Sequence, residues 1–417
     1  MIGSFDFDRK EALEFHKKAK GKVQTIPTVN IRNEHQLGIA YVPGCVIACD
    51  EIKHNPSLVY EYTGKANRIA EVSNGHEVLG MGDVGPEASI PMLEGKALLL
   101  KLFGDVNAIP MAINAPTADE IINFCRMIAP TVGAINIEDI GSPDTFHVVR
   151  RLTETLDIPV FCDDQQGSAV IILSAVKNSI RLLDISLPES RIVVMGAGAA
   201  GIASTDLLLK AGAHDIIILD EGGILGPSHP GMDNVQAGIA EKTNPRGVRG
   251  GLDEAIAGAD ILVGLSRGNT VSKGHIKKMN KKPVVLALAL SNPEISHVDA
   301  VNAGAFIYAS GNVHDDNAML NIHAFPGIVR GALDVRAKKL TDSMLLAASD
   351  ALANMIDRRN LTPDHICPKF FGSETTPRVA EAVGQAAISD GVAFLTIPEG
   401  RIYQDTWHRL FGDIEHI

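Results

Sequence analysis

The chain has little of what builds a disulfide-stabilised protein. Its five cysteines are spread over 417 residues, which is too sparse for a disulfide framework. Cys45 and Cys49 stand four apart, but no further ligand at matching spacing completes a metal site. We therefore expect free thiols in a reducing compartment.

Positive charge is also scarce, and long apolar runs are missing. Lys and Arg number 38 against 50 Asp and Glu, giving a net charge of -12. A chain without a basic excess cannot neutralise phosphates, so general nucleic-acid binding is excluded. No apolar run approaches the ~18–20 residues that span a bilayer, and the first twenty residues are too charged for a signal peptide. We expect a soluble, cytoplasmic protein without a membrane partner.

Hydrophobic residues are plentiful, at 45% of the chain, which is enough for large cores and for two or three domains. Short apolar segments followed by turn residues alternate with helical patterns, and no fixed-period repeat is evident. This alternation predicts an α/β fold with parallel sheets. From residue 331 onward the pattern is mostly helical.

Two neighbouring strand predictions end in paired carboxylates. GAINIED ends at Glu138 and Asp139, and IPVFCDD ends at Asp163 and Asp164, with a helical pattern between them. The carboxyl ends of parallel strands meet at the ligand-binding edge of an α/β sheet. Oxygen ligands without a companion histidine suit Mg²⁺ or Mn²⁺. Neighbouring residues of a strand point to opposite faces, so Glu138 and Asp139 can share an ion only where strand geometry has ended.

A glycine-rich turn follows the apolar strand RIVVM and opens a helix. Its residues are Gly196, Ala197, Gly198, Ala199, Ala200 and Gly201. Strand, G-x-G-x-x-G and helix together predict a dinucleotide site, with the pyrophosphate at the helix N-terminus. Asp220 ends the next strand, where a carboxylate accepts hydrogen bonds from ribose hydroxyls and repels a 2′-phosphate. No Arg or Lys follows directly, so the sequence favours NAD over NADP.

The order of these motifs resembles the malic enzyme family, in its short prokaryotic form. The matching segments run from about residue 25 to 355: AYVPG, YTGKANRIAEVSNG, VLGMGDVGPEASIPMLEGKALLLK, NIEDI, IPVFCDDQQGSA, GAGAAGIA, LALSNP and FPGIVRGALDVRA. The resemblance implies an N-terminal α/β substrate and metal domain and a Rossmann-type NAD-binding domain, with C-terminal helices packing back. We place these at residues 1–165, 166–330 and 331–417.

The resemblance also implies roles for individual residues. Tyr41 matches the tyrosine that protonates the enolate carbon, Lys96 the lysine that takes the hydroxyl proton, and Asp163 the acid that supports this lysine. Glu138, Asp139 and Asp164 match the metal ligands. Asn292, near the dinucleotide and the substrate, and Asn321 match two asparagines that contact substrate. Alone, Tyr41 is typical of a packed turn and Lys96 of a solvated helix.

The implied reaction is oxidative decarboxylation of malate, or of a closely related β-carboxy-2-hydroxy acid, by NAD and a divalent cation in a homodimer. Two alternatives stay open. One is a metal-dependent decarboxylase of an oxaloacetate-type β-keto acid with little net redox, and the other is a non-catalytic NAD or ligand sensor. The chain departs from the family pattern near the predicted substrate, at Val42, Cys162, Gln166 and residues 313–321, where His314, Asp315, Asp316 and Leu320 stand. These departures leave the substrate acid open.

Overall fold

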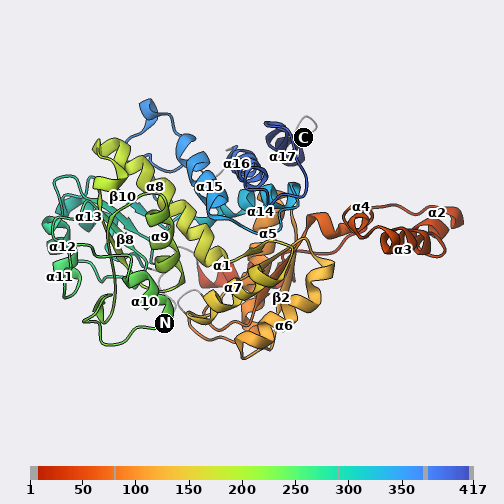
Figure 1. The fold of residues 1–417 in the computed structure, drawn as a ribbon, viewed down its shortest axis with the longest axis horizontal. Coiled ribbons are helices and arrows are strands. Elements are labelled where there is room, and N and C mark those ends of the chain that lie inside the picture. Colours follow the sequence, from red (N-terminus) through yellow and green to blue (C-terminus); the bar gives the residue numbers. More distant parts are fainter. Residues whose placement is uncertain (1–7, 79–80, 290–291, 370–373, 413–417) are drawn as a thin grey trace.

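The computed structural model describes residues 8–78, 81–289, 292–369 and 374–412, and Figure 1 shows two α/β units joined by a long central helix. The first unit holds a four-stranded parallel sheet in the order β2-β1-β3-β4. Its strands are β1 (Arg68–Ser73), β2 (Asn107–Ala112), β3 (Ala134–Ile137) and β4 (Val160–Phe161). Its helices are α5 (Pro86–Gly104), α6 (Ala118–Ile128) and α7 (Asp144–Thr155). The predicted parallel pair of acidic strand ends is confirmed as β3 and β4.

The second unit is built on a six-stranded sheet in the order β10-β9-β8-β5-β6-β7. Five strands are parallel, as the sequence predicted: β5 (Arg191–Met195), β6 (Asp215–Asp220), β8 (Ile261–Gly264), β9 (Val284–Ala287) and β10 (Ile307–Ser310). The short β7 (Gly223–Ile224) adds an antiparallel edge. The helices are α9 (Ala199–Lys210), α10 (Asn234–Ala240), α11 (Leu252–Ala255), α12 (Lys273–Lys278) and α13 (His297–Ala303).

One apolar core connects the two units through the central helix α8 (Ser168–Leu183). Ten residues of α8 are buried, and the same cluster reaches from Leu100 in α5 to Ile192 in β5. A single π-helical turn, η4 (Asp163–Gly167), leads from β4 into α8. The second acidic strand end therefore lies at the junction of the two units.

The C-terminal helices pack back on both units, which confirms that part of the predicted fold. They are α14 (Phe325–Asp334), α15 (Asp342–Asn354), α16 (Thr375–Ser389) and α17 (Arg401–Phe411). Helix α15 contacts α8, whereas α14 and α17 contact α5. None of the helices in the described ranges is long and apolar enough to cross a membrane.

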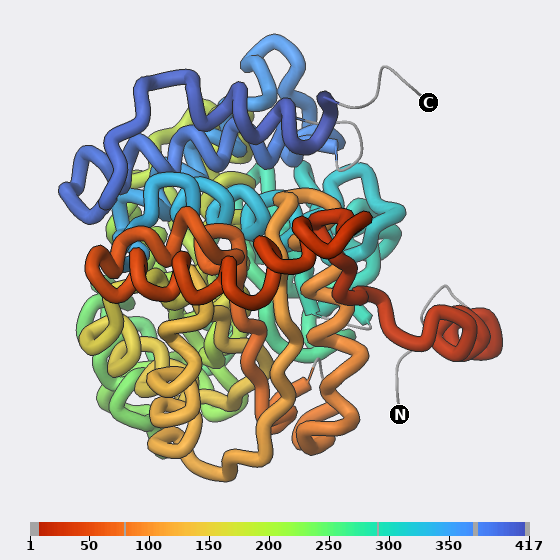
Figure 2. The backbone as a smooth tube through the Cα atoms, turned by 90° about the vertical axis from the view of Figure 1, so that its right-hand side faces the viewer, coloured from red at the N-terminus to blue at the C-terminus, as the bar shows by residue number. Residues whose placement is uncertain are grey.

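The N-terminal segment forms an arm outside this body. It carries α1 (Arg9–Ala19), α2 (Glu34–Ala40), α3 (Gly44–His54) and α4 (Val59–Tyr62), and none of these helices buries a residue. Helices α2 and α3 project beyond the first unit in Figure 1, and Figure 2 looks onto the arm from that side. Large apolar side chains on α2 and α3 are exposed, including Ile39, Val46 and Ile47. An isolated chain thus leaves an apolar surface of the arm uncovered.

Candidate active site

The acidic strand ends lie together at the carboxyl edge of the first sheet. Strand β3 ends at Ile137, and Asp139 has a left-handed backbone with φ of 53°. Strand geometry has therefore ended where Glu138 and Asp139 follow one another, which removes the obstacle to their facing one region. Across the edge, the Asp139 N–H donates to Asp164 Oδ2 at 3.2 Å. Glu138, Asp139 and Asp163 are buried in this small volume.

Lys96, from the middle of α5, is the cation at this edge. Its ammonium donates to Asp163 Oδ2 and lies 2.9 Å from Glu138 Oε1. It also stands over the Phe325 ring, 5.5 Å from the ring centre. Burial would lower the pKa of Lys96, but the Asp163 and Glu138 carboxylates outweigh burial and hold that pKa well above its ordinary value. In this arrangement Lys96 is an ammonium.

Asn136, inside strand β3, connects the two acidic strand ends by hydrogen bonds. Its Nδ2 donates to Glu138 Oε2 and to Glu71 Oε2, both at 2.7 Å, and its Oδ1 accepts from the Asp163 N–H at 3.2 Å. Glu71, opposite Asn136 in β1, is fully buried. Burial raises the pKa of Glu71 to about 8, and the charge of Glu138 adds to the rise. Sequence reasoning missed both residues, although Asn136 stands two before Glu138 and so shares its face of the strand.

A cavity of about 380 Å³ brings this edge and the glycine loop together. Asp139 and Asp164 line it, and so does the start of α9 with the preceding glycine, from Gly198 to Gly201. Asn321, from the short turn η6 (Asn321–His323), also lines it, and its Nδ2 donates to Ser168 Oγ and to the Asp163 carbonyl, both at 3.3 Å. A dinucleotide on the loop and a small acid at the carboxylates would share this space.

Two carboxylates at this edge of the sheet carry unsatisfied oxygens. Asp139 Oδ2 and Asp163 Oδ1 are buried without a hydrogen-bond partner among the described residues, and such atoms are costly to leave unpaired. Burial raises the pKa of Asp139 to about 7, with the Glu138 charge as the next cause. Burial, and then the charge of Asp139, also raise the pKa of Asp164. These oxygens suit a hard cation in chemical type.

The predicted metal ligands do not form a closed site in this arrangement. No three Asp, Glu, His or Cys side chains converge on one point within the part of the chain that the structure describes. Glu138 is turned to Lys96 and Asn136 instead of the cavity. Burial raises the pKa of Glu138 to about 7 despite the Lys96 ammonium, and the charges of Asp164 and Asp163 add to the rise. Ion binding would therefore require Glu138 to leave Lys96.

Asp220 lies at the carboxyl end of β6, beside the glycine loop, where the sequence predicted it. Two other predicted residues do not join the site. Tyr41 ends α2 on the arm and is 69% exposed. Asn292 is exposed on the loop after β9. Residues 79–80 and 290–291 of two family motifs lie outside the described residues.

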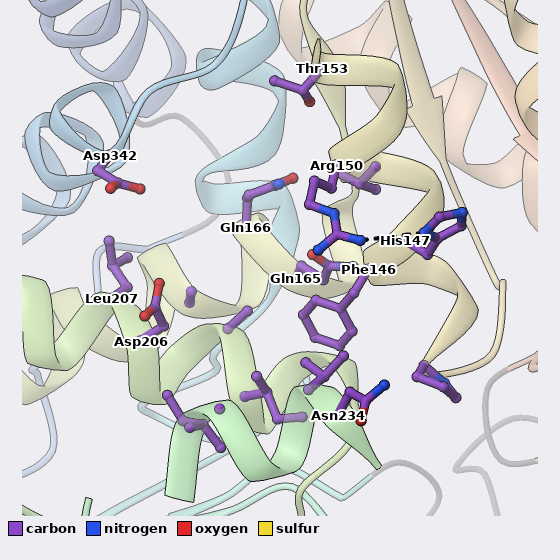
Figure 3. Close-up of a pocket in the computed structure, with 18 of the residues that line it drawn as sticks. Phe146, His147, Arg150, Thr153, Gln165, Gln166, Asp206, Leu207, Asn234 and Asp342 are labelled. Atoms are coloured by element: carbon purple, nitrogen blue, oxygen red, sulfur yellow. Dashed lines mark hydrogen bonds between the residues drawn. The ribbon is translucent and has the colours of Figure 1, made fainter. Parts of the chain in front are cut away.

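The family departures fall mostly outside the 380 Å³ cavity. A larger cavity, of about 1200 Å³, lies on the other side of η4 between α7, α9 and α10. Figure 3 shows Gln165 and Gln166 among its lining residues. Cys162 is buried, with its thiol 3.6 Å from Thr145 Oγ1. His314 and Asp316 are exposed, and of the departing loop only Met319, Leu320 and Asn321 line the smaller cavity.

Fold and cavity together define a two-unit α/β protein in which a glycine loop of the Rossmann type and a carboxylate edge line one cavity. Comparison with known proteins gives the family. The model of the malic enzyme NAD-binding domain matches residues 165–388, and that of the malic enzyme N-terminal domain matches residues 20–118. The chain belongs to the malic enzyme family.

Relatives and solved structures agree with this assignment. A bifunctional malic/malolactic enzyme of Bacillus subtilis (strain 168) is 39% identical, over 95% of this chain and 97% of the relative. An NAD-dependent malic enzyme of Geobacillus stearothermophilus is 39% identical, over 89% and 78%. The malic enzyme structure from Pyrococcus horikoshii matches with a TM-score of 0.92 and 37% identity, covering 98% and 97%. NADP-dependent relatives also occur, and this chain spans about half of their length.

Proposed function

We propose that the protein oxidatively decarboxylates malate, or a closely related β-carboxy-2-hydroxy acid, with NAD as acceptor. The products are pyruvate or its analogue, CO₂ and NADH. One observation carries this proposal: Asp164, next to the Lys96–Asp163 pair, lines the same cavity as the glycine loop. Hydride transfer needs a proton acceptor and a nicotinamide at the same carbon, and the shared cavity supports assigning these two roles to the edge and the loop.

In the proposed reaction the substrate hydroxyl proton goes to Lys96 Nζ, and NAD, when bound at the glycine loop, would supply the acceptor for the hydride on the same carbon. The bond to the carboxylate β to the new carbonyl then breaks, its electron pair forms the enolate as CO₂ leaves, and Tyr41 gives its hydroxyl proton to the enolate carbon. Lys96 must first lose a proton, because Asp163 and Glu138 hold it as an ammonium. Asp163, its contact partner, is the nearest group that could take that proton. Asn321 and Asn292 are proposed to contact substrate, with Asn292 also near the nicotinamide.

We propose that Asp139, Asp164 and Glu138 hold Mg²⁺ or Mn²⁺. Asp139 and Asp164 line the cavity, and the Asp139 Oδ2 has no other described partner. A bound cation would polarise the substrate oxygen and stabilise the enolate. The Asp139 N–H holds the Asp164 carboxylate at the cavity, whereas Glu138 would have to turn from Lys96 to join the ion.

A homodimer would bring Tyr41 to a site. Tyr41 lies on the exposed arm and not at the carboxylate edge of its own chain. The uncovered apolar residues of α2 and α3 favour burial against a second copy. In such a dimer the arm would carry Tyr41 to the partner's Lys96.

We further propose substrate and metal functions for residues 1–165, NAD binding for 166–330 and a packing role for 331–417. We also propose a cytoplasmic location.

The proposal is tested by following NADH formation from malate with Mn²⁺ and NAD⁺. We expect turnover, and we expect Lys96→Ala to lose it by at least about 100-fold, as general-base removal typically does. Lys101→Ala, on the exposed side of the same helix, is the matched control and should retain activity. Absence of turnover with malate and with substituted malates would refute the proposal. Release of CO₂ from oxaloacetate without NAD⁺, together with no NADH from malate, would favour the decarboxylase alternative.

A further inference from the structure

Asp220 is held by three donors before any nucleotide arrives. The Gly222 N–H and His229 Nε2 each lie 2.7 Å from its Oδ1, and Gln236 Nε2 lies 3.4 Å from its Oδ2. Gln236 also reaches the Ala197 carbonyl of the glycine loop at 3.4 Å. Because Oδ1 has two close partners and Oδ2 only one long one, Oδ2 is the oxygen left for ribose hydroxyls.

The contacts of His229 fix its tautomer. The Gly231 N–H donates to His229 Nδ1 at 3.3 Å, so Nδ1 must carry a lone pair and no hydrogen. The ring proton is then on Nε2, which donates to Asp220 Oδ1. Acceptance at Nδ1 and donation at Nε2 is the hydrogen-bonding pattern of a neutral imidazole, and the side chain is only 3% exposed. A hydrogen on Nδ1 as well would bring two donors against each other.

The backbone is shaped around this imidazole. A Cβ at Gly222 would lie 2.6 Å from His229 Nε2 and 3.2 Å from Asp220 Oδ1, so a side chain there would displace the ring. Arg267 is a cation near Asp220 in the fold. Its guanidinium pairs with Glu221, the residue after Asp220. Both partners are more than two-thirds exposed, so this pair is weak. Arg267 does not touch Asp220 in any described contact.

We propose that His229 is a positioning residue that sets coenzyme specificity through Asp220. This inference rests on NAD binding at the glycine loop, as proposed above. A neutral imidazole orients the carboxylate without cancelling its charge. Oδ2 then accepts from a ribose with free hydroxyls, and the uncompensated charge repels a ribose 2′-phosphate. A cationic residue at the same position would orient Asp220 equally but neutralise it.

Three variants of the full-length protein test the inference. His229→Ala removes the donor to Asp220, and we expect KM for NAD⁺ to rise about tenfold, as for one lost hydrogen bond to a charged group, with little change in kcat. His229→Gln restores a neutral donor and should recover most of this loss. His229→Lys should shift the ratio of kcat/KM for NAD⁺ over NADP⁺ towards NADP⁺ by at least tenfold. His214→Ala, at the exposed start of β6, is the matched control.

Binding of NADH and NADPH, followed by their fluorescence, gives a readout apart from turnover. A purely structural role for His229 would weaken both nucleotides equally and leave their ratio unchanged, which would overturn the inference. So would folded His229→Ala and His229→Lys proteins with wild-type KM and wild-type ratio. If the wild-type protein itself binds no NADH, the proposed function has failed at its coenzyme and the inference falls with it. Thermal unfolding identifies variants that have not folded. If His229→Ala and His229→Lys have not folded, the test rests on the nucleotide binding of His229→Gln.

Discussion

At the scale of the residue, two buried carboxylates, Glu138 and Asp163, pair with the same ammonium, that of Lys96. Asp163 and Asp164 are neighbours in the chain but serve different sides, since Asp163 lies against Lys96 and Asp164 lines the cavity. Lys96 and the carboxylates could be predicted from the sequence, because each stands in a recognisable motif. It did not reveal that Glu138 also turns to Lys96. That contact depends on how α5 crosses the sheet, and spacing along one strand does not contain it.

Glu71 gives a prediction about pH and stability. Its pKa is raised from 4.5 to about 8 in the folded protein, so the folded state holds a proton that the unfolded state releases between these values. Stability must therefore fall as pH rises from about 5 to 8, by at most on the order of 4 kcal/mol from this group. Glu71→Gln should remove that part of the fall.

Urea unfolding of the metal-free protein at pH 5 and pH 8.5 measures this effect. The other buried carboxylates titrate in the same window, so the difference between wild type and Glu71→Gln is the informative quantity. Glu87→Gln, at the exposed start of α5, is the control. If the free energy of unfolding changed with pH equally in wild type and Glu71→Gln, Glu71 would be ionised in the folded protein, and the prediction would be wrong.

At the scale of the element, the sequence predicted those segments whose pattern is local. The parallel strands of the second sheet follow the predicted alternation of short apolar segments with helical patterns, and the apolar periodicity of residues 168–183 is that of the helix α8. The stretch from 226 to 251 is rich in Gly, Pro and Asn, a composition typical of a loop, yet it contains α10. Asp233 and Gln236 form a capping box there, which offsets poor helix propensity. The π-turn η4 was not predicted, since it depends on packing at the junction of the units.

The glycine loop yields a paired prediction, because two of its glycines are required for different reasons. A Cβ at Gly201 would lie 1.8 Å from the Gly196 carbonyl oxygen, whereas a Cβ at Gly198 would meet nothing within 4 Å. We expect Gly201→Ala to lower Tm by several degrees, since helix α9 can no longer approach the loop. Gly198→Ala should keep the wild-type Tm but weaken NADH binding about tenfold or more, because the new methyl occupies pyrophosphate space.

Differential scanning calorimetry and NADH fluorescence titration check both halves of this pair. Gly212→Ala, at a turn with φ of 101° and open space, is a control for backbone strain without a steric clash. Tight NADH binding by Gly198→Ala would mean that the pyrophosphate does not approach the loop at this glycine. A wild-type Tm for Gly201→Ala would mean that the helix can move away without cost.

At the scale of the whole molecule, the arm is the feature that the sequence did not foretell. The motif AYVPG identified Tyr41, but it contained nothing about the distance between that residue and Lys96. The structure places Tyr41 on a projecting helix pair with exposed apolar side chains. The distance of Tyr41 from its own carboxylate edge and the exposed apolar side chains are both explained if the arm packs against a partner chain. Assembly and chemistry would then share the same segment.

A mixed dimer tests this directly. Tyr41→Phe and Lys96→Ala chains, carried on different tags and co-expressed, give a heterodimer that two-step affinity purification isolates. If the arm serves the partner, one site holds both residues intact and the other holds neither, so the heterodimer should show about half of wild-type activity. Each parent homodimer should be nearly inactive. An inactive heterodimer would show that both residues serve the same chain.

The exposed arm has a consequence for how the protein behaves on dilution. If each copy completes the other's site, a separated chain has a bound coenzyme but no proton donor at the right place. Specific activity would then fall as the total protein concentration passes below the dissociation constant of the dimer, and it would return on concentration. The abundance of the protein in its compartment would act as its own regulator, without any effector.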